Sequence, residues 1–213
     1  MSIIVADPAR IDMAQLDLLA RMAKDKGIKR LYLHWTGGHY GHVYDSYHVS
    51  IGKNGELYLP ENEIQLDAFV RRRSHTYQRN TGALGITLCC GYGAKISAGG
   101  IVDFGPEPPT CLQIEAMARV IAHITHYLGI VITPYTVQTH GEVADADGYG
   151  PGGTDPDLRW DLWVLEDLPF RMGLHPGGEV LRGKASYYLE HEFGQREEVN
   201  EGCQLTKRLL NAA

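Results

Sequence analysis

The sequence predicts a mixed α/β fold, in which a central, mainly mixed β-sheet is flanked by helices. Segments with strand-like and helix-like patterns alternate along the chain, which is typical of α/β domains. Lys53-Asn54-Gly55 separates two strand-like runs, and Asn-Gly at such a position is the strongest short signal for a β-hairpin. Because a hairpin supplies an antiparallel pair, a purely parallel sheet is excluded.

The N-terminal region is expected to form a helix and then a strand. Asp7-Pro8 has the form of a helix cap followed by proline at the first helical position, and Gly27 ends the helical pattern of apolar residues. Residues 30–35 are expected to form a short strand that ends at a Thr-Gly-Gly turn. This strand carries a histidine next to its last residue, and active sites are often built at such loop edges.

Four strands and a long helix are expected after this turn. The hairpin strands cover 47–51 and 56–59, and the apolar residues 85–90 form a buried central strand. A capping box opens a helix over 110–126, and residues 130–132 form another short strand.

The chain is expected to contain one domain over 1–168 and a C-terminal extension over 169–213 that is not a second full domain. A length of 213 residues favours one compact domain, which can bury a sizeable core without disulfide or metal staples. Asp155-Pro156 could cap a last core helix, whereas the sequence after Pro169 is first turn-rich and then charged.

Charge and hydropathy exclude two classes of partner. The net charge is −6, and no basic stripe is present, which argues against a nucleic-acid-binding protein. No run approaches the ~20 apolar residues of a membrane-spanning helix, so membrane insertion is not expected. The N-terminal sequence lacks the pattern of a secretory signal, which predicts synthesis as a soluble cytoplasmic chain.

Several of the ten histidines could bind a metal or be structural. His123 and His126 lie three apart on the expected long helix, which suits either two ligands or a polar helix face; the polar face is the favoured interpretation. His39, His42 and His48 near the hairpin could form a cluster, which is a weaker hypothesis.

His34, His140 and Asp155 form the most specific pattern. His34 lies near the end of a strand, His140 lies in Gln-Thr-His-Gly, and Asp155 follows fifteen residues later in Gly-Thr-Asp-Pro. Two imidazoles and one carboxylate would give a catalytic zinc ion three protein ligands and leave its fourth position open for water. From spacing alone, an incidental arrangement of loop residues stays open.

Ordered segments of the chain resemble a known family from about Arg30 to Asp161. These segments are 31–35, 46–51 with 53–55, 74–75 with 80–86, His140, and 154–156 with 160–161. Together they resemble the type-2 N-acetylmuramoyl-L-alanine amidases. This family includes phage lytic amidases, bacterial wall-recycling amidases and animal peptidoglycan-recognition proteins.

The resemblance implies roles for four residues. His34, His140 and Asp155 would bind Zn²⁺, which can activate water and polarise a carbonyl group. Tyr47 would assist near the zinc by a hydrogen bond to water or to the oxyanion. The resemblance does not fix the general base. Glu142 is the nearest carboxylate in sequence, and it could be a general base or could orient a ligand; the orienting role is favoured.

The implied activity is hydrolysis of the amide bond between N-acetylmuramic acid and L-alanine, with peptidoglycan or muropeptides as substrates and 1–168 as the amidase catalytic domain. The alternative is a non-catalytic module that only binds peptidoglycan. The recycling branch carries a glutamate where this chain has Thr87, and many members have Lys or Thr where it has Gly153.

The biological setting is therefore expected to be cell-wall lysis by a phage lysin or an injected antibacterial effector, in preference to recycling. Such a protein would act on the cell wall or in the periplasm. An immunity or delivery protein is a further candidate partner.

Overall fold

A computed structural model describes residues 2–97, 101–151, 159–166 and 173–194. The strands are β1 (Ala9–Ile11), β2 (Arg30–Trp35), β3 (Val49–Ile51), β4 (Leu57–Leu59), β5 (Ala83–Leu88), β6 (Lys95–Ile96), β7 (Val102–Asp103), β8 (Val137–Thr139), β9 (Val164–Glu166) and β10 (Leu174–Pro176). The helices are α1 (Met13–Met22), α2 (Leu66–Val70), α3 (Cys111–Leu128), α4 (His140–Ala146) and α5 (Gly177–Leu189), and a π-helical turn (Glu190–Gly194) follows α5.

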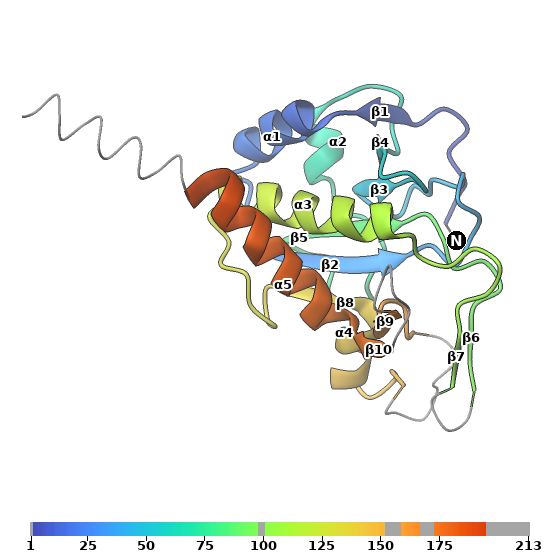
Figure 1. Ribbon diagram of the computed structural model, residues 1–213. Coiled ribbons are helices and arrows are strands. Elements are labelled where there is room, and N and C mark those ends of the chain that lie inside the picture. The colour runs from blue at the N-terminus through green and yellow to red at the C-terminus, as the bar shows by residue number, and fades with distance from the viewer. Residues whose placement is uncertain (1, 98–100, 152–158, 167–172, 195–213) are drawn as a thin grey trace, which may run out of the picture.

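The main sheet has six strands in the order β1-β4-β3-β5-β2-β8 (Figure 1). The four strands β3, β5, β2 and β8 run parallel, whereas β4 pairs antiparallel with both β3 and β1. The predicted mixed sheet flanked by helices is therefore confirmed, as is the hairpin formed by β3 and β4. All four parallel strands end at the same edge of the sheet.

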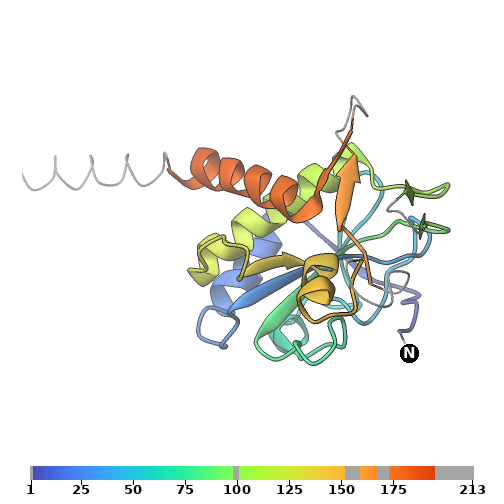
Figure 2. The same ribbon diagram turned by 90° about the horizontal axis from the view of Figure 1, so that it is seen from below.

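Neighbouring side chains of a strand point to opposite faces, so alternate residues of β2 have different surroundings. Leu31, Leu33 and Trp35 belong to the main hydrophobic core, which α1, α3 and α5 cover on one face of the sheet (Figure 2). Tyr32 packs on the opposite face with Val143 of α4. His34 is fully buried and follows Tyr32 on that second face.

Local capping explains where two helices begin. Thr110 and Gln113 form the predicted capping box at the start of α3, and Gly129 ends this helix in the left-handed conformation. The predicted cap at Asp7-Pro8 is wrong. Helix α1 begins at Met13 instead, because Asp12 and Gln15 form a capping box and the residues just before them pair with β4 as β1.

Two other elements differ from the sequence prediction. Residues 130–132 form no strand, and the strand of this region is β8, because Thr133 and Thr136 first form a hydrogen-bonded turn. Asp155-Pro156 lies outside the described residues, and the described stretch 159–166 contains the strand β9 and no helix.

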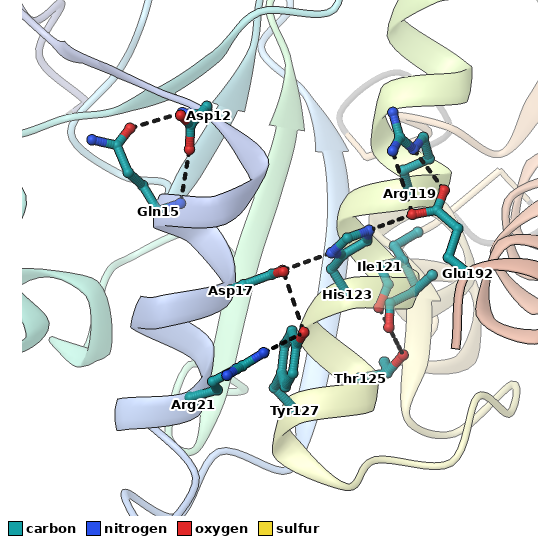
Figure 3. A network of polar contacts seen from close by, with 11 residues as sticks. Asp12, Gln15, Asp17, Arg21, Arg119, Ile121, His123, Thr125, Tyr127 and Glu192 are labelled. Carbon is teal, nitrogen blue, oxygen red and sulfur yellow. Dashed lines mark hydrogen bonds and ion pairs between the residues drawn. The ribbon is translucent and has the colours of Figure 1, made fainter. Parts of the chain in front are cut away.

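Helix α5 packs against α3, and it is a regular helix in a part of the chain that was expected to be turn-rich. Leu181 and Ala185 of α5 are fully buried in the main core. Figure 3 shows the polar contacts at the end of this region, where His123 of α3 lies between Asp17 of α1 and Glu192 of the π-helical turn, at 2.6 and 2.8 Å. These contacts join the first and last described helices.

Among the residues described here, no helix is both long enough and apolar enough to cross a membrane.

Candidate metal centre

The candidate site lies at the edge where the parallel strands end, on the face opposite α3. His34 is the residue before the end of β2, and Thr87 lies beside it in register on β5. His140 comes directly after β8, the other neighbour of β2. In open α/β sheets, ligands bind outside the carboxyl ends of the strands, so this edge is where a site is expected.

His34, His140 and Asp161 converge at this edge. The Asp161 carboxylate lies between the two imidazoles, with Oδ2 at 3.1 Å from His34 Nδ1 and Oδ1 at 2.9 Å from His140 Nδ1. The ring centroids of the two histidines are 4.8 Å apart. Within the described part of the chain, this is the one group of three side chains that could hold a metal ion, and its ligand atoms all lie within 4.8 Å of one another.

Asp161 is held in place by its neighbours in the chain. Trp160 packs edge-to-face on Trp35, the last residue of β2, with ring centroids 4.6 Å apart. The carbonyl oxygen of Asp161 accepts a hydrogen bond of 3.1 Å from the Gly141 amide in α4. Leu162, directly after it, has a φ of 57°, which is uncommon for a residue other than glycine and is often found beside functional residues.

Burial and mutual contact set the charges of this group. Burial lowers the pKa of His34, and the hydrogen bond to Asp161 offsets this only in part, so the imidazole is neutral. Burial alone would raise the pKa of the Asp161 carboxyl, but the contacts with His140 and His34 outweigh it and hold this pKa below its ordinary value. The group therefore offers an ionised carboxylate and at least one neutral imidazole.

These residues fit a metal ion. Zinc takes nitrogen from neutral histidines and oxygen from carboxylates, and three protein ligands are the usual set at a catalytic zinc. His140 Nε2 is buried and has no hydrogen-bond partner, so this ring leaves a nitrogen unsatisfied in a polar, buried place. A bound cation would compensate the buried carboxylate and orient both rings.

The helix α4 fixes His140 through a capping box at its N-terminus. The Thr139 hydroxyl accepts from the Glu142 amide, and the Glu142 carboxylate accepts from the Thr139 amide at 2.9 Å. Arg182 of α5 donates to both oxygens of Glu142, each at 2.9 Å, and to the Val137 carbonyl oxygen at 3.0 Å. Glu142 is thus engaged in holding the segment that carries His140.

Tyr47 lies beside the candidate centre. Its ring centroid is 5.1 Å from that of His34, and it lines a cavity of about 340 Å³ together with His140 and Asp161. Burial, and then the nearby Asp161 carboxylate, raises the pKa of the Tyr47 hydroxyl, so the phenol stays protonated and can donate a hydrogen bond. Arg159 and Trp160 line the same cavity.

The structure brings His34, His140 and Tyr47 together at one edge of the sheet, whereas it does not describe the third predicted ligand. Asp155 lies outside the described residues, and its role stays a prediction. Asp161 is the carboxylate that the described residues place between the histidines. The only signal for it was the Trp-Asp pair in the last matching segment, because neither the spacing nor the residue type separates two aspartates six positions apart.

The other histidine groups have different environments. His48 accepts a hydrogen bond from the Gly85 amide at Nδ1 and contacts the Arg71 carbonyl oxygen at 2.8 Å through Nε2, so both nitrogens are used within the fold. His39 pairs with Glu107 at 2.6 Å, and its side chain is 45% exposed. His123 contacts two carboxylates that belong to other elements, which agrees with the structural interpretation.

Comparison with known proteins gives one finding. Residues 13–156 match a family model described as N-acetylmuramoyl-L-alanine amidase. No curated protein and no solved structure is significantly similar to the chain.

Proposed function

Because the matched region spans more than half of its length, the chain belongs to the N-acetylmuramoyl-L-alanine amidase family, and we propose that it is a zinc-dependent hydrolase of bacterial peptidoglycan. Its substrate would be the amide bond between N-acetylmuramic acid and L-alanine. The observation that carries this proposal is the group formed by His34, His140 and Asp161 at the carboxyl edge of the sheet. A protein that only recognises peptidoglycan has no need for these converging ligands.

The protein's own residues would bind the zinc ion and prepare the amide. A zinc ion held by His34, His140 and an aspartate would supply Lewis acidity and lower the pKa of a water molecule. Tyr47 would donate a hydrogen bond to the carbonyl oxygen as negative charge develops on it, because its hydroxyl is protonated and the residue lines the same cavity. Glu142 would act as a positioning residue for His140, since Arg182 and the Thr139 amide already engage its carboxylate.

We further propose wall lysis, by a phage lysin or an injected antibacterial effector, in preference to recycling of muropeptides. Thr87, where the recycling branch has a glutamate, is fully buried and lies beside His34 in the sheet. It supplies no carboxylate for proton transfer at this position. Intact sacculi would then be better substrates than soluble anhydro-muropeptides, and the ratio of the two rates tests this setting.

The activity is tested with purified protein, peptidoglycan sacculi, and mass spectrometry of the new ends. We expect free L-alanine amino termini with zinc, and none after chelation. His140→Ala should abolish them, whereas His175→Ala, which removes an exposed imidazole on β10, should leave them unchanged. Folded, zinc-loaded protein that binds sacculi but releases no such ends would identify a recognition module instead.

The third ligand is tested by comparing two aspartate variants. If Asp161 binds the metal, as the described geometry suggests, Asp161→Asn should weaken zinc binding by about 100-fold or more, because the buried charged ligand is lost. Asp155→Asn would then have a small effect. The opposite result, measured by competition with a chromophoric chelator, would assign the metal to Asp155 and leave Asp161 as a hydrogen-bond partner of the two histidines.

A further inference from the structure

Two buried polar side chains, those of Thr76 and His75, lie behind His34 on the side away from Asp161. His34 Nε2 is 3.3 Å from the hydroxyl oxygen of Thr76, and the same oxygen is 2.9 Å from His75 Nδ1. Thr76 is only 2% exposed and His75 is 7% exposed. Neither residue lines the cavity that contains Tyr47 and Asp161.

The loop that carries Thr76 is itself fixed by Asn80. The Asn80 side-chain oxygen accepts hydrogen bonds from the backbone amides of His75 and Thr76, at 3.1 and 2.8 Å. The His75 ring lies directly over Gly85 of β5, where a Cβ atom would come within 2.6 Å of the ring. The backbone bonds and the absent side chain together place the Thr76 hydroxyl next to His34.

This arrangement has a feature that stability alone does not explain. His75 Nε2 is buried without a hydrogen-bond partner, and such groups are rare in folded proteins because they are costly. An apolar side chain over Gly85 would fill the same place without that cost. The buried polar contacts of Thr76 and His75 are therefore better explained by an effect on the orientation of the His34 ring than by packing alone.

We propose that Thr76 is a positioning residue that fixes the His34 ring for metal binding. An imidazole that binds a metal through one nitrogen carries its proton on the other, and the partner of that proton sets the orientation of the ring. His34 presents Nδ1 to the centre, so with a metal ion on Nδ1 the ring would carry its proton on Nε2 and donate it to the Thr76 oxygen, 3.3 Å away. His75 and Asn80 hold the hydroxyl in place.

This inference rests on the proposed zinc site, and its test uses zinc affinity in place of activity. Thr76→Val keeps the shape of the side chain but removes the hydroxyl. We expect it to weaken zinc binding by about 10- to 100-fold, which is the usual effect of losing such a partner. Thr76→Ser keeps the hydroxyl and should bind zinc within about threefold of the unmodified protein.

Thr125 provides a matched control. It is as deeply buried as Thr76, but its hydroxyl bonds only to carbonyl oxygens of its own helix, with Ile121 at 2.7 Å (Figure 3). Thr125→Val should leave zinc affinity unchanged. Cobalt substitution gives a second readout: the visible spectrum of bound Co²⁺ should change in Thr76→Val and stay unchanged in Thr125→Val.

The outcomes separate this inference from the function on which it rests. If the unmodified protein binds no zinc, the proposed function fails, and the inference fails with it. If the unmodified protein binds zinc and Thr76→Val binds it equally well, only the inference is overturned. Should Thr76→Val not fold, Thr76→Ser decides: a large loss of affinity with the hydroxyl still present would show that the methyl group matters, and not the hydrogen bond.

Discussion

At the scale of single residues, the centre depends on which atom each side chain offers. Both histidines turn Nδ1 toward Asp161, and the remaining nitrogens have different surroundings: His34 Nε2 contacts Thr76, whereas His140 Nε2 has no partner. The two rings are therefore not equivalent. His34 is fully buried behind the centre, while His140 lines the cavity that also contains Tyr47.

Tyr47 allows a prediction at this scale. Tyr47→Phe should lower kcat by about 100-fold, the usual effect of removing one hydrogen-bond donor to an oxyanion, because the phenol is protonated and lies beside the centre. Zinc affinity should not change, since Tyr47 is not a ligand. Tyr58→Phe makes the same chemical change on β4 and should leave kcat unaltered. A kcat for Tyr47→Phe within twofold of the unmodified protein would remove Tyr47 from the mechanism.

At the scale of secondary structure, the site is supported by a helix from outside the matched family region. Arg182 of α5 donates two hydrogen bonds to Glu142, which caps the helix that begins with His140. The Arg182 side chain is 12% exposed and that of Glu142 is 23% exposed, so the pair is largely shielded from water. The C-terminal region thus contributes to the geometry of the centre through Glu142.

Arg182→Ala tests this support. Removing the guanidinium leaves a largely buried carboxylate without its main partner, which should lower the free energy of unfolding by about 2–3 kcal/mol. Lys184→Ala on the same helix removes a more exposed pair with Glu115 and should cost no more than about 1 kcal/mol. Urea unfolding monitored by circular dichroism measures both. Equal losses in the two variants would show that Glu142 does not depend on Arg182.

The elements that the sequence predicted correctly are those with strong local signals. The hairpin around Asn54-Gly55 and the capping box of α3 are set by residues close together in sequence, and both formed as expected. Helix α5 was missed because it begins with two glycines, which disfavour a helix. Its apolar residues are buried only because they pack against α3, a contact that the local sequence does not indicate. In the same way, the place of Asp161 depends on Trp160 packing against Trp35, a contact between distant segments that no local pattern indicates.

At the scale of the whole molecule, the buried histidines in and around the centre make the stability of the fold sensitive to acid. His34, His48 and His75 are buried on one face of the sheet, and burial lowers the pKa of each, that of His48 to about 3. In the unfolded chain, a histidine has a pKa of about 6.5. Below that pH the unfolded state therefore binds more protons than the folded state, and the free energy of unfolding falls as the pH falls.

His48 allows this sensitivity to be assigned to one side chain. Between about pH 6.5 and pH 5, where most carboxylates stay ionised, the metal-free protein should lose up to about 1.4 kcal/mol per pH unit for each such histidine. His48→Gln can keep the contacts with the Gly85 amide and the Arg71 carbonyl group, but it does not titrate. Its free energy of unfolding, measured in urea with a chelator present, should depend on pH less steeply, because one proton fewer is taken up on unfolding. His175→Gln, which changes an exposed histidine, should keep the original slope. An unchanged slope in His48→Gln would show that His48 is protonated in the folded protein, contrary to the environment seen here.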